Sequence, residues 1–441
     1  MAPVTFEPVD AFTARHRDFT REVDGATHPV IQALRESAIA RVSSIGFPTR
    51  KHEEWRTTDL TPVYATPFSP AIPDPGSAVE IPLPAKLFLE ASSPLAVFVD
   101  GIFVTRLSRT PTDGHGVTVS ALSRMLDESG DFRALLESYD ESRADVFAEL
   151  NSAFLVDGAA VQVEDGKGSD RPVVLLHLST AAGGPRHVSP RTAVIAGRGS
   201  RLRLVEIHAS LGDGRTFTNA RTDISLHAES TMEYVRVLVE NEGTIHIDRT
   251  SVLQETESTA ATHSFVFGGG TVRHNLVHTL DGEGAEARLF GLVLADGRRR
   301  VDNVTRIEHA RPSTRSFERY KGIVAGEARH SFTGRIVVRP DAAKTDARQT
   351  IANLLLGARA SAEVKPQLEI LSDDVRCTHG ATVGRLDPDA LFYLRSRGID
   401  ADEAQRILTR AFAVEMLDEI GEEWMRRSLD TLLQDRLRRI L

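Results

Sequence analysis

A stretch of more than 200 residues without an amphipathic helix of ordinary length constrains the fold of this chain more than any other feature. Between about Leu155 and Ile370 the sequence consists of short, β-branched and often alternating segments, separated by Gly, Asp and Asn. Val173–Leu178 and Tyr234–Val239 are examples, and such segments are typical of strands. A single β-sandwich rarely needs so many strands, which favours a β-solenoid or a large two-sheet body. No strict short period is visible, so the solenoid prediction rests on the number of strands.

The chain before this stretch has helical patterns joined by irregular segments. Apolar residues at helical spacing predict a helix over about Val30–Ile45, because Gly46 and a following proline form a stop signal. Residues 64–84 are rich in Pro and Ala and are expected to form an extended surface connection. Three- and four-residue apolar steps among charges predict amphipathic helices over Leu122–Leu126 and Phe132–Phe154.

The chain after this stretch returns to helical patterns. Asp387 supplies an N-cap to a short helix that ends at Gly398. Asp400 and Glu403 form a capping box that opens a longer helix, and Glu422–Ile440 carries a broad apolar face. We therefore expect a mainly β protein with flanking helices, organised as an N-terminal region of residues 1–154, a β core of residues 155–385 and a C-terminal helical region of residues 386–441.

Composition limits the classes of function. The 53 basic and 62 acidic side chains give a net charge of −9 and are mostly interleaved, which argues against a nucleic-acid partner. The single cysteine, Cys377, rules out an intramolecular disulfide framework and indicates a reducing compartment. Met1–Glu7 does not begin a secretory signal, and no later window is apolar enough to span a bilayer. We expect a cytoplasmic protein without a membrane segment.

Cys377 and His379 are the strongest candidates for a chemical site. They lie two residues apart, so in a strand they project from the same face. A thiolate is a nucleophile and a metal ligand, and a neighbouring histidine can lower the pKa of the thiol and add a nitrogen donor. The alternative is a small buried apolar residue beside a turn histidine.

The other polar features have structural interpretations. His274 and His278 could share a strand face, but they lack a third ligand nearby, so we expect structural or surface roles. The run of residues 268–270 is a glycine corner between strands, and Trp55 is expected to anchor its segment on the β core. The adjacent acids at 373 and 374 indicate a solvated turn. The sequence lacks a phosphate-binding loop, a strand-to-helix dinucleotide motif, a nucleophile elbow and a zinc-protease motif, so we expect neither nucleotide hydrolysis nor triad chemistry.

The stretch from Tyr320 to Phe412 resembles the SufB/SufD family of iron–sulfur cluster assembly proteins. The matching motifs are Tyr320–Ile323, Lys344–Gln349, Asn353–Leu356, Pro366–Ile370, Asp373–Gly384 and Leu391–Ile399. A weaker similarity covers Pro48–Leu60, where Lys51, Glu53 and Trp55 fit an early motif of the family. Within the family, the length and the single cysteine are similar to those of the shorter, cysteine-poor member.

The resemblance implies a right-handed parallel β-helix with N- and C-terminal helical regions, in a complex with SufB and two copies of the ATPase SufC. It implies a non-catalytic scaffold whose His379 acts with a SufB cysteine where the nascent iron–sulfur cluster forms. Cys377 occupies the neighbouring position of that motif. The C-terminal helices would dock the ATPase, and Phe392, Leu408 and Phe412 are the candidate contact residues.

Two physical arguments agree with this interpretation. A single Cys–His pair cannot supply the four ligands that a cluster normally has, so we expect a transient cluster shared with SufB and none held stably by the isolated chain. Because the chain lacks a phosphate-binding loop, we expect ATP hydrolysis to be carried out by a partner. An exposed strand edge further predicts that the isolated chain forms a homodimer. The alternative is a polysaccharide-active β-solenoid enzyme, which would need a groove with acid/base carboxylates.

Overall fold

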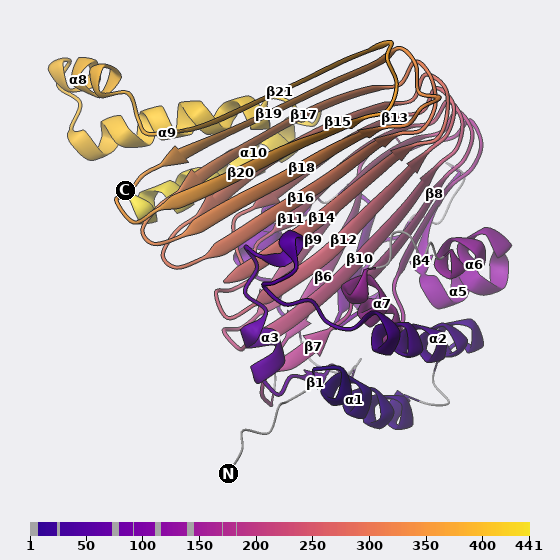
Figure 1. Cartoon of the computed structure of the whole chain (residues 1–441). Coiled ribbons are helices and arrows are strands. Elements are labelled where there is room, and N and C mark those ends of the chain that lie inside the picture. The colour runs from indigo at the N-terminus through magenta and orange to yellow at the C-terminus, as the bar shows by residue number, and fades with distance from the viewer. Residues whose placement is uncertain are drawn as a thin grey trace.

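The computed structural model describes residues 8–23, 27–72, 79–90, 92–110, 116–138, 145–169, 171–181 and 183–441. Its centre is a stack of long strands in two sheets, with helices at both ends of the chain (Figure 1). The expected absence of a signal at residues 1–7, and parts of the predicted connection at 64–84 and helix at 132–154, lie outside the described residues.

Most successive strands alternate between the two sheets, and within each sheet almost all neighbours are parallel. This is the topology of a parallel β-solenoid, so that prediction is confirmed. The strands of the first sheet, from the C-terminal edge, are β20 (Ser361–Ile370), β18 (Arg329–Val338), β16 (Arg300–His309), β14 (Thr271–Leu280), β12 (Ile245–Gln254), β10 (Thr216–Leu226), β8 (Arg191–Ala196), β5 (Ala159–Val163) and β4 (Val117–Ala121). In addition, β7 (Arg186–Val188) pairs with β10, and β1 (Ser69–Pro70) pairs with β7.

The second sheet runs alongside the first. Its strands, from the C-terminal edge, are β21 (Val375–Gly384), β19 (Thr345–Leu355), β17 (Arg315–Val324), β15 (Glu286–Ala295), β13 (Thr259–Val266), β11 (Thr231–Leu238), β9 (Arg201–Leu211), β6 (Val173–Thr180), β2 (Leu95–Val99) and β3 (Ile102–Phe103). Register is kept along the whole ladder, so inward-facing residues of successive strands stack on one another.

One corner of the solenoid repeats a left-handed residue in every turn. These residues are Gly199, Glu229, Glu257, Gly284, Ser313 and Lys344, all with φ between 56° and 73°. Each donates its backbone N–H to a carbonyl in the corner of the next turn, as Glu229 does to Thr256 at 2.8 Å. The corner therefore continues the ladder from turn to turn, although only some of its positions are the glycines that this conformation favours.

The N-terminal region covers one end and one side of the stack (Figure 1). Its helical elements are α1 (Pro8–Val23), α2 (Pro29–Ile45), η1 (Glu53–Trp55), α3 (Thr61–Ala65), α4 (Leu83–Lys86), η2 (Thr105–Leu107), α5 (Leu122–Glu128), α6 (Gly130–Glu137) and α7 (Val146–Ala153). The predicted helix over residues 30–45 is confirmed by α2. This region also adds β2 and β4 to the two sheets, which the sequence did not indicate.

The helical pattern predicted over Phe132–Phe154 is interrupted in the structure. In the described part of this stretch, helix α6 ends at Glu137 and α7 begins at Val146. The Asp145 carboxylate accepts hydrogen bonds from the backbone of residues 147 and 148, and this N-cap starts α7 independently. In the extended connection predicted at 64–84, the described residues include the end of α3, β1 and the start of α4.

The C-terminal helices are α8 (Pro388–Ser396), α9 (Ala401–Leu417) and α10 (Glu423–Ile440). The apolar faces of α9 and α10 join the largest core cluster, against the outside of the second sheet, whereas α8 has no buried residue and extends away from the stack (Figure 1). The predicted caps form, since the Asp387 and Asp400 carboxylates accept from the backbone of residues 389 and 403. Among the described residues, no helix is both long and apolar enough to cross a membrane.

Candidate functional site at the open end of the solenoid

Strand β21 forms one edge of the last solenoid turn and carries both residues of the Cys–His motif. It pairs with β19 and has no fully buried residue. Cys377 is in register with Ala347 and His379 with Gln349, both of which are buried and face the interior. Because register partners share a face, Cys377 and His379 both lie on the inward face at the open end. The prediction that the two residues share a strand face is confirmed.

Cys377 is partly buried in a small apolar cluster. Its neighbours there include Ile336, Val338 and Ala347. Burial raises the pKa of the Cys377 thiol, and the nearby Asp346 carboxylate raises it further. His379 does not produce the lowered pKa expected from the sequence, because desolvation and an acidic neighbour dominate the thiol's surroundings. In the isolated chain Cys377 is a protonated thiol near neutral pH.

His379 is exposed, unlike the histidines deeper in the stack. Among the described residues it forms no hydrogen bond or ion pair, so its ring nitrogens are free to bind an external group. No group of three or more His, Cys, Asp or Glu side chains suited to a metal occurs in the described part of the chain. An iron–sulfur cluster at this edge would therefore need most of its ligands from another molecule.

A polar column lies below His379 inside the solenoid. The Gln349 Nε2 donates a hydrogen bond of 2.5 Å to the Glu318 carboxylate, which is completely buried. Burial raises the pKa of Glu318 to about 7, while the hydrogen bond from Gln349 lowers it. The sequence analysis missed Glu318. Gln349 lies in the Lys344–Gln349 motif, which was the only signal for this column.

The interior further from the open end is rich in buried, paired polar side chains. His274 bonds Asp248 at 3.0 Å and His278 bonds Gln254 at 3.0 Å, in agreement with the structural roles expected for both histidines. Desolvation lowers the pKa of His278 to about 3, so its ring is neutral. The network is only partly satisfied, since Asp248 Oδ1 has no hydrogen-bond partner among the described residues.

Strand β20 forms the second edge of the open end and is held by an N-terminal strap, residues 49–58. Glu53 forms an ion pair with Lys365, and Arg56 with Glu363 at 3.0 Å. Trp55 packs against Phe147, with ring centroids 5.0 Å apart, and lies 3.8 Å from the Arg273 guanidinium. The expected role of Trp55 as an anchor is confirmed. The early family motif thus connects the N-terminal region to the last solenoid turn.

The three candidate partner-binding residues have different surroundings. Phe392 on α8 is 74% exposed and its neighbour Tyr393 is 58% exposed. Leu408 on α9 is half-buried. Phe412 packs partly into the core, where Lys321 Nζ lies 4.5 Å from its ring and donates a 2.9 Å bond to its carbonyl. Helix α8 therefore offers the larger free apolar surface.

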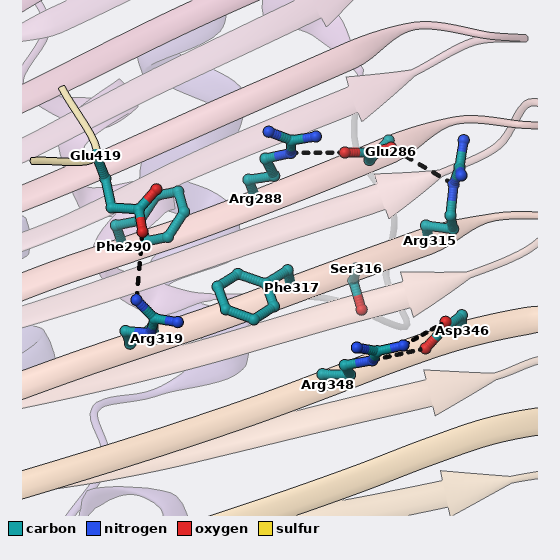
Figure 2. Close-up of a pocket in the computed structure, with 10 residues that line it drawn as sticks. All are labelled: Glu286, Arg288, Phe290, Arg315, Ser316, Phe317, Arg319, Asp346, Arg348 and Glu419. Carbon is teal, nitrogen blue, oxygen red and sulfur yellow. Dashed lines mark hydrogen bonds and ion pairs between the residues drawn. The ribbon is translucent and has the colours of Figure 1, made fainter. Parts of the chain in front are cut away.

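An outward-facing groove of about 390 Å³ lies on β15, β17 and β19 beside the turn that joins α9 to α10. Figure 2 shows four arginines around Phe317, each near a carboxylate. Glu286 pairs with two of them at 2.6 and 3.4 Å, Asp346 with one at 3.0 Å and Glu419 with one at 3.2 Å. The carboxylates are neutralised by arginine, which does not suit them to the acid/base chemistry that a polysaccharide-active enzyme needs.

Comparison with known proteins gives matches over nearly the whole chain. Residues 177–412 match the model of the SUF system FeS cluster assembly SufBD core domain, and residues 9–175 match that of the SufBD protein N-terminal region. The iron–sulfur cluster assembly protein SufD of Escherichia coli is 34% identical over 89% of this chain and 90% of its own length. A SufBD family protein of Synechocystis is 29% identical over 90% of this chain and 89% of its own. The chloroplastic protein ABCI7 of Arabidopsis thaliana is 27% identical over 90% and 84%.

Proposed function

The chain belongs to the SufBD family and has a role in iron–sulfur cluster assembly, and we propose that it acts there as a non-catalytic scaffold between SufB and the ATPase SufC. The observation that carries the proposal is the free β21 edge, which presents an unpartnered imidazole beside a thiol. An unpaired strand ten residues long is a surface that binds another strand. SufB is the partner proposed for this edge.

His379 is the proposed cluster ligand of this chain, and Cys377 is its proposed neighbour in the site. An imidazole suits iron, and a thiol can bind iron or sulfur once it is deprotonated. The chain offers only these two donors at the edge, so the remaining ligands of the nascent cluster come from SufB. The cluster is cargo that is built and passed on rather than a resident cofactor of the isolated chain.

The test is the iron and sulfide content of the complex after anaerobic co-expression with SufB and SufC. His379→Ala should leave folding and the subunit ratio unchanged, because the side chain is exposed and unpaired. Iron per complex should fall several-fold. A normal iron content at a matched subunit ratio would refute the ligand role. Loss of the complex itself would make His379 a structural residue of the interface.

The C-terminal helices are the proposed docking site for SufC. Phe392 and Tyr393 on α8 form an exposed aromatic pair, and aromatic residues supply much of the energy of protein interfaces. Phe392→Ala should weaken SufC binding at least about tenfold without changing the unfolding midpoint. Thr409 is buried on α9, so Thr409→Val is a control for disturbance of the helix without loss of this surface. A chain truncated at about residue 383 that still binds SufC would contradict the assignment.

Three further predictions belong to the same proposal. Without SufB, the β21 edge would pair with a second copy, so we expect a homodimer, and light scattering of a strict monomer would exclude it. The proposed division assigns residues 1–154 to an N-terminal region that packs on the solenoid, residues 155–385 to the core where the cluster is built, and residues 386–441 to the region that docks the ATPase. The protein is expected in the cytoplasm, where fractionation of cells would find it together with SufB and SufC.

A further inference from the structure

Gln349 is buried directly behind the site and one of its two polar atoms has no partner. The side chain is 1% exposed, and its Nε2 is bonded to Glu318. Its Oε1 has no hydrogen-bond partner among the described residues. Buried amide oxygens are almost always bonded, and an unpaired one costs about 1–3 kcal/mol. This atom therefore requires an explanation.

The register places Gln349 between Glu318 and His379. Strands β17, β19 and β21 are successive in the sheet, and Gln349 pairs with Glu318 on one side and with His379 on the other. Side chains at such positions share a face and lie about 4.8 Å apart along the sheet. The nitrogen and oxygen of an amide point in different directions from one carbon. With the nitrogen directed to Glu318, the oxygen is left for the side of His379.

The amide is also held from the opposite sheet. A Cβ built at Gly334 on β18 would lie 2.1 Å from Gln349 Nε2, so the amide occupies the space that the missing side chain leaves. Rotating the amide by 180° would place its oxygen against an oxygen of Glu318. Two acceptors would then face each other whenever that carboxyl is ionised. The orientation of Gln349 is therefore fixed above about pH 7, where the Glu318 carboxyl is ionised.

We propose that Gln349 is a positioning residue for His379: the exposed ring, which makes no hydrogen bond to the described residues, turns toward the interior and donates its ring N–H to the unpartnered Gln349 Oε1. This bond fixes the imidazole tautomer and leaves the other ring nitrogen unprotonated and directed to the free edge. Histidine ligands are oriented in this way by a carbonyl or carboxylate behind them. Glu318 holds the amide in place and does not contact the cluster. The inference rests on the proposed ligand role of His379.

The test reads the tautomer of His379 in the isolated chain, without iron. Long-range ¹H–¹⁵N spectra distinguish the two neutral tautomers, and the His379 signals are assigned by their loss in His379→Ala. The wild-type ring should be mostly one tautomer, and Gln349→Leu should shift the ratio at least about threefold toward the other. Thr350→Val is the matched control, because Thr350 is the next residue of β19 and faces outward. An unchanged tautomer ratio in Gln349→Leu would overturn the proposal.

A second variant distinguishes loss of the Gln349 hydrogen bond from misfolding of the chain. Gln349→Leu leaves the Glu318 carboxyl buried without its donor, which is costly, whereas replacing both partners by apolar groups can be nearly neutral. The double variant Glu318→Leu/Gln349→Leu should therefore fold, as judged by circular dichroism, and should show the same altered tautomer ratio. A folded double variant with the wild-type ratio would also overturn the proposal.

The ligand role of His379 and the positioning role of Gln349 can be refuted separately. If His379→Ala complexes lose iron while Gln349→Leu leaves the tautomer ratio unchanged, His379 is a ligand and Gln349 does not position it. If Gln349→Leu changes the ratio while His379→Ala complexes keep normal iron, the hydrogen bond exists and the ligand role is refuted. When both hold, Gln349→Leu complexes should contain less iron than Thr350→Val complexes.

Discussion

The N-terminal end of the solenoid is capped, whereas its C-terminal end is open. At the N-terminal end, short antiparallel strands β3 and β4 terminate the two sheets, and helices pack nearby, so residues such as Phe98 and Val161 are completely buried. At the C-terminal end, β20 and β21 are each ten residues long and contain no fully buried residue. Solenoids need a cap at each end to prevent uncontrolled association. This chain caps one end itself and leaves the other open.

The two edges of the open end also differ from each other. Strand β20 is tied to the strap by Lys365 and Glu363, and it contains Pro366. The amides of Ser361 and Leu371 donate to Ala328 and Val338, on the side of β18. Odd-numbered residues therefore bond inward, and Pro366 lies where its missing N–H would face the free edge. Proline at such a position blocks pairing without weakening the sheet. Strand β21 contains no proline, so its edge is not blocked in this way.

The largest expected effect is on the free energy of unfolding, which should fall far more for a substitution at the closed end than for one at the open end. Phe98→Ala removes a completely buried ring that packs on Phe103 and His177 at the closed end. We expect a loss of about 3–5 kcal/mol in the free energy of unfolding. The matched change at the open end, Val383→Ala, removes a side chain that is 47% exposed and should cost less than about 1 kcal/mol. Urea unfolding measures both, and equal losses would show that the two ends do not differ in this way.

The second prediction concerns pH. Burial raises the pKa of Glu318 in the folded protein to about 7, above its ordinary value of 4.5. The folded state binds this proton more tightly, so the stabilisation is complete below about pH 4.5 and is lost as the pH rises through about 7. The difference amounts to about 3 kcal/mol. Glu318→Gln should therefore gain stability relative to the wild type between pH 5 and pH 8, and a difference that does not change with pH would contradict this.

At the closed end, the pKa of a buried histidine is shifted in the opposite direction, so its contribution to stability changes with pH in the opposite way. Desolvation, with a smaller contribution from Arg15, lowers the pKa of His187 to about 3, below its ordinary value of 6.5. The unfolded state binds the proton more readily, so stability is present above about pH 6.5 and is lost as the pH falls toward 3. His187→Phe should reduce this acid sensitivity, because the site is already lined by Phe12, Phe154 and Phe217. Thermal unfolding at pH 5 and pH 8 compares the two ends directly.

The fourth prediction tests which strand edge is used. The amide of Asp346 donates to Thr314, the residue before β17, so alternate residues of β19 bond β21. In β21 the odd-numbered amides therefore face the free edge. Ala381→Pro should therefore preserve folding and prevent pairing with SufB. Thr382→Pro removes a ladder bond and should cost about 1–3 kcal/mol. Size-exclusion chromatography with SufB and urea unfolding separate these effects, and unchanged pairing in Ala381→Pro would exclude β21 as the interface.

Much of the fold could be predicted from composition and strand patterns, but its period could not. The corner residues recur once in every turn, yet they are Gly, Glu, Ser or Lys, because the backbone bonds of the corner hold the left-handed conformation. No sequence repeat therefore marks the turns. Strands β2 and β4 were missed for a related reason, since they are short and gain their stability from β6 and β5, which lie far along the chain.

The site could be predicted only where it is local in sequence. Cys377 and His379 are two residues apart, so strand geometry is enough to place them together. Gln349 and Glu318 lie on other strands, and only the register brings them behind His379. The state of Cys377 could not be predicted either, because its raised pKa depends on burial by residues of β18 and on Asp346.

The smallest expected effect concerns Cys377 itself and compares the two residues of the motif. The thiol is half-buried among apolar neighbours and is protonated in the isolated chain, as expected of a small packing residue. Cys377→Ser should lower the free energy of unfolding by about 0.5–1 kcal/mol, because a hydroxyl replaces a weakly polar sulfur. Cys377→Ala keeps the apolar contact and should cost less. Iron per complex should stay near the wild-type value in both variants while it falls in His379→Ala. A loss of iron in Cys377→Ala equal to that in His379→Ala would show instead that SufB binding deprotonates the thiol and makes it a ligand.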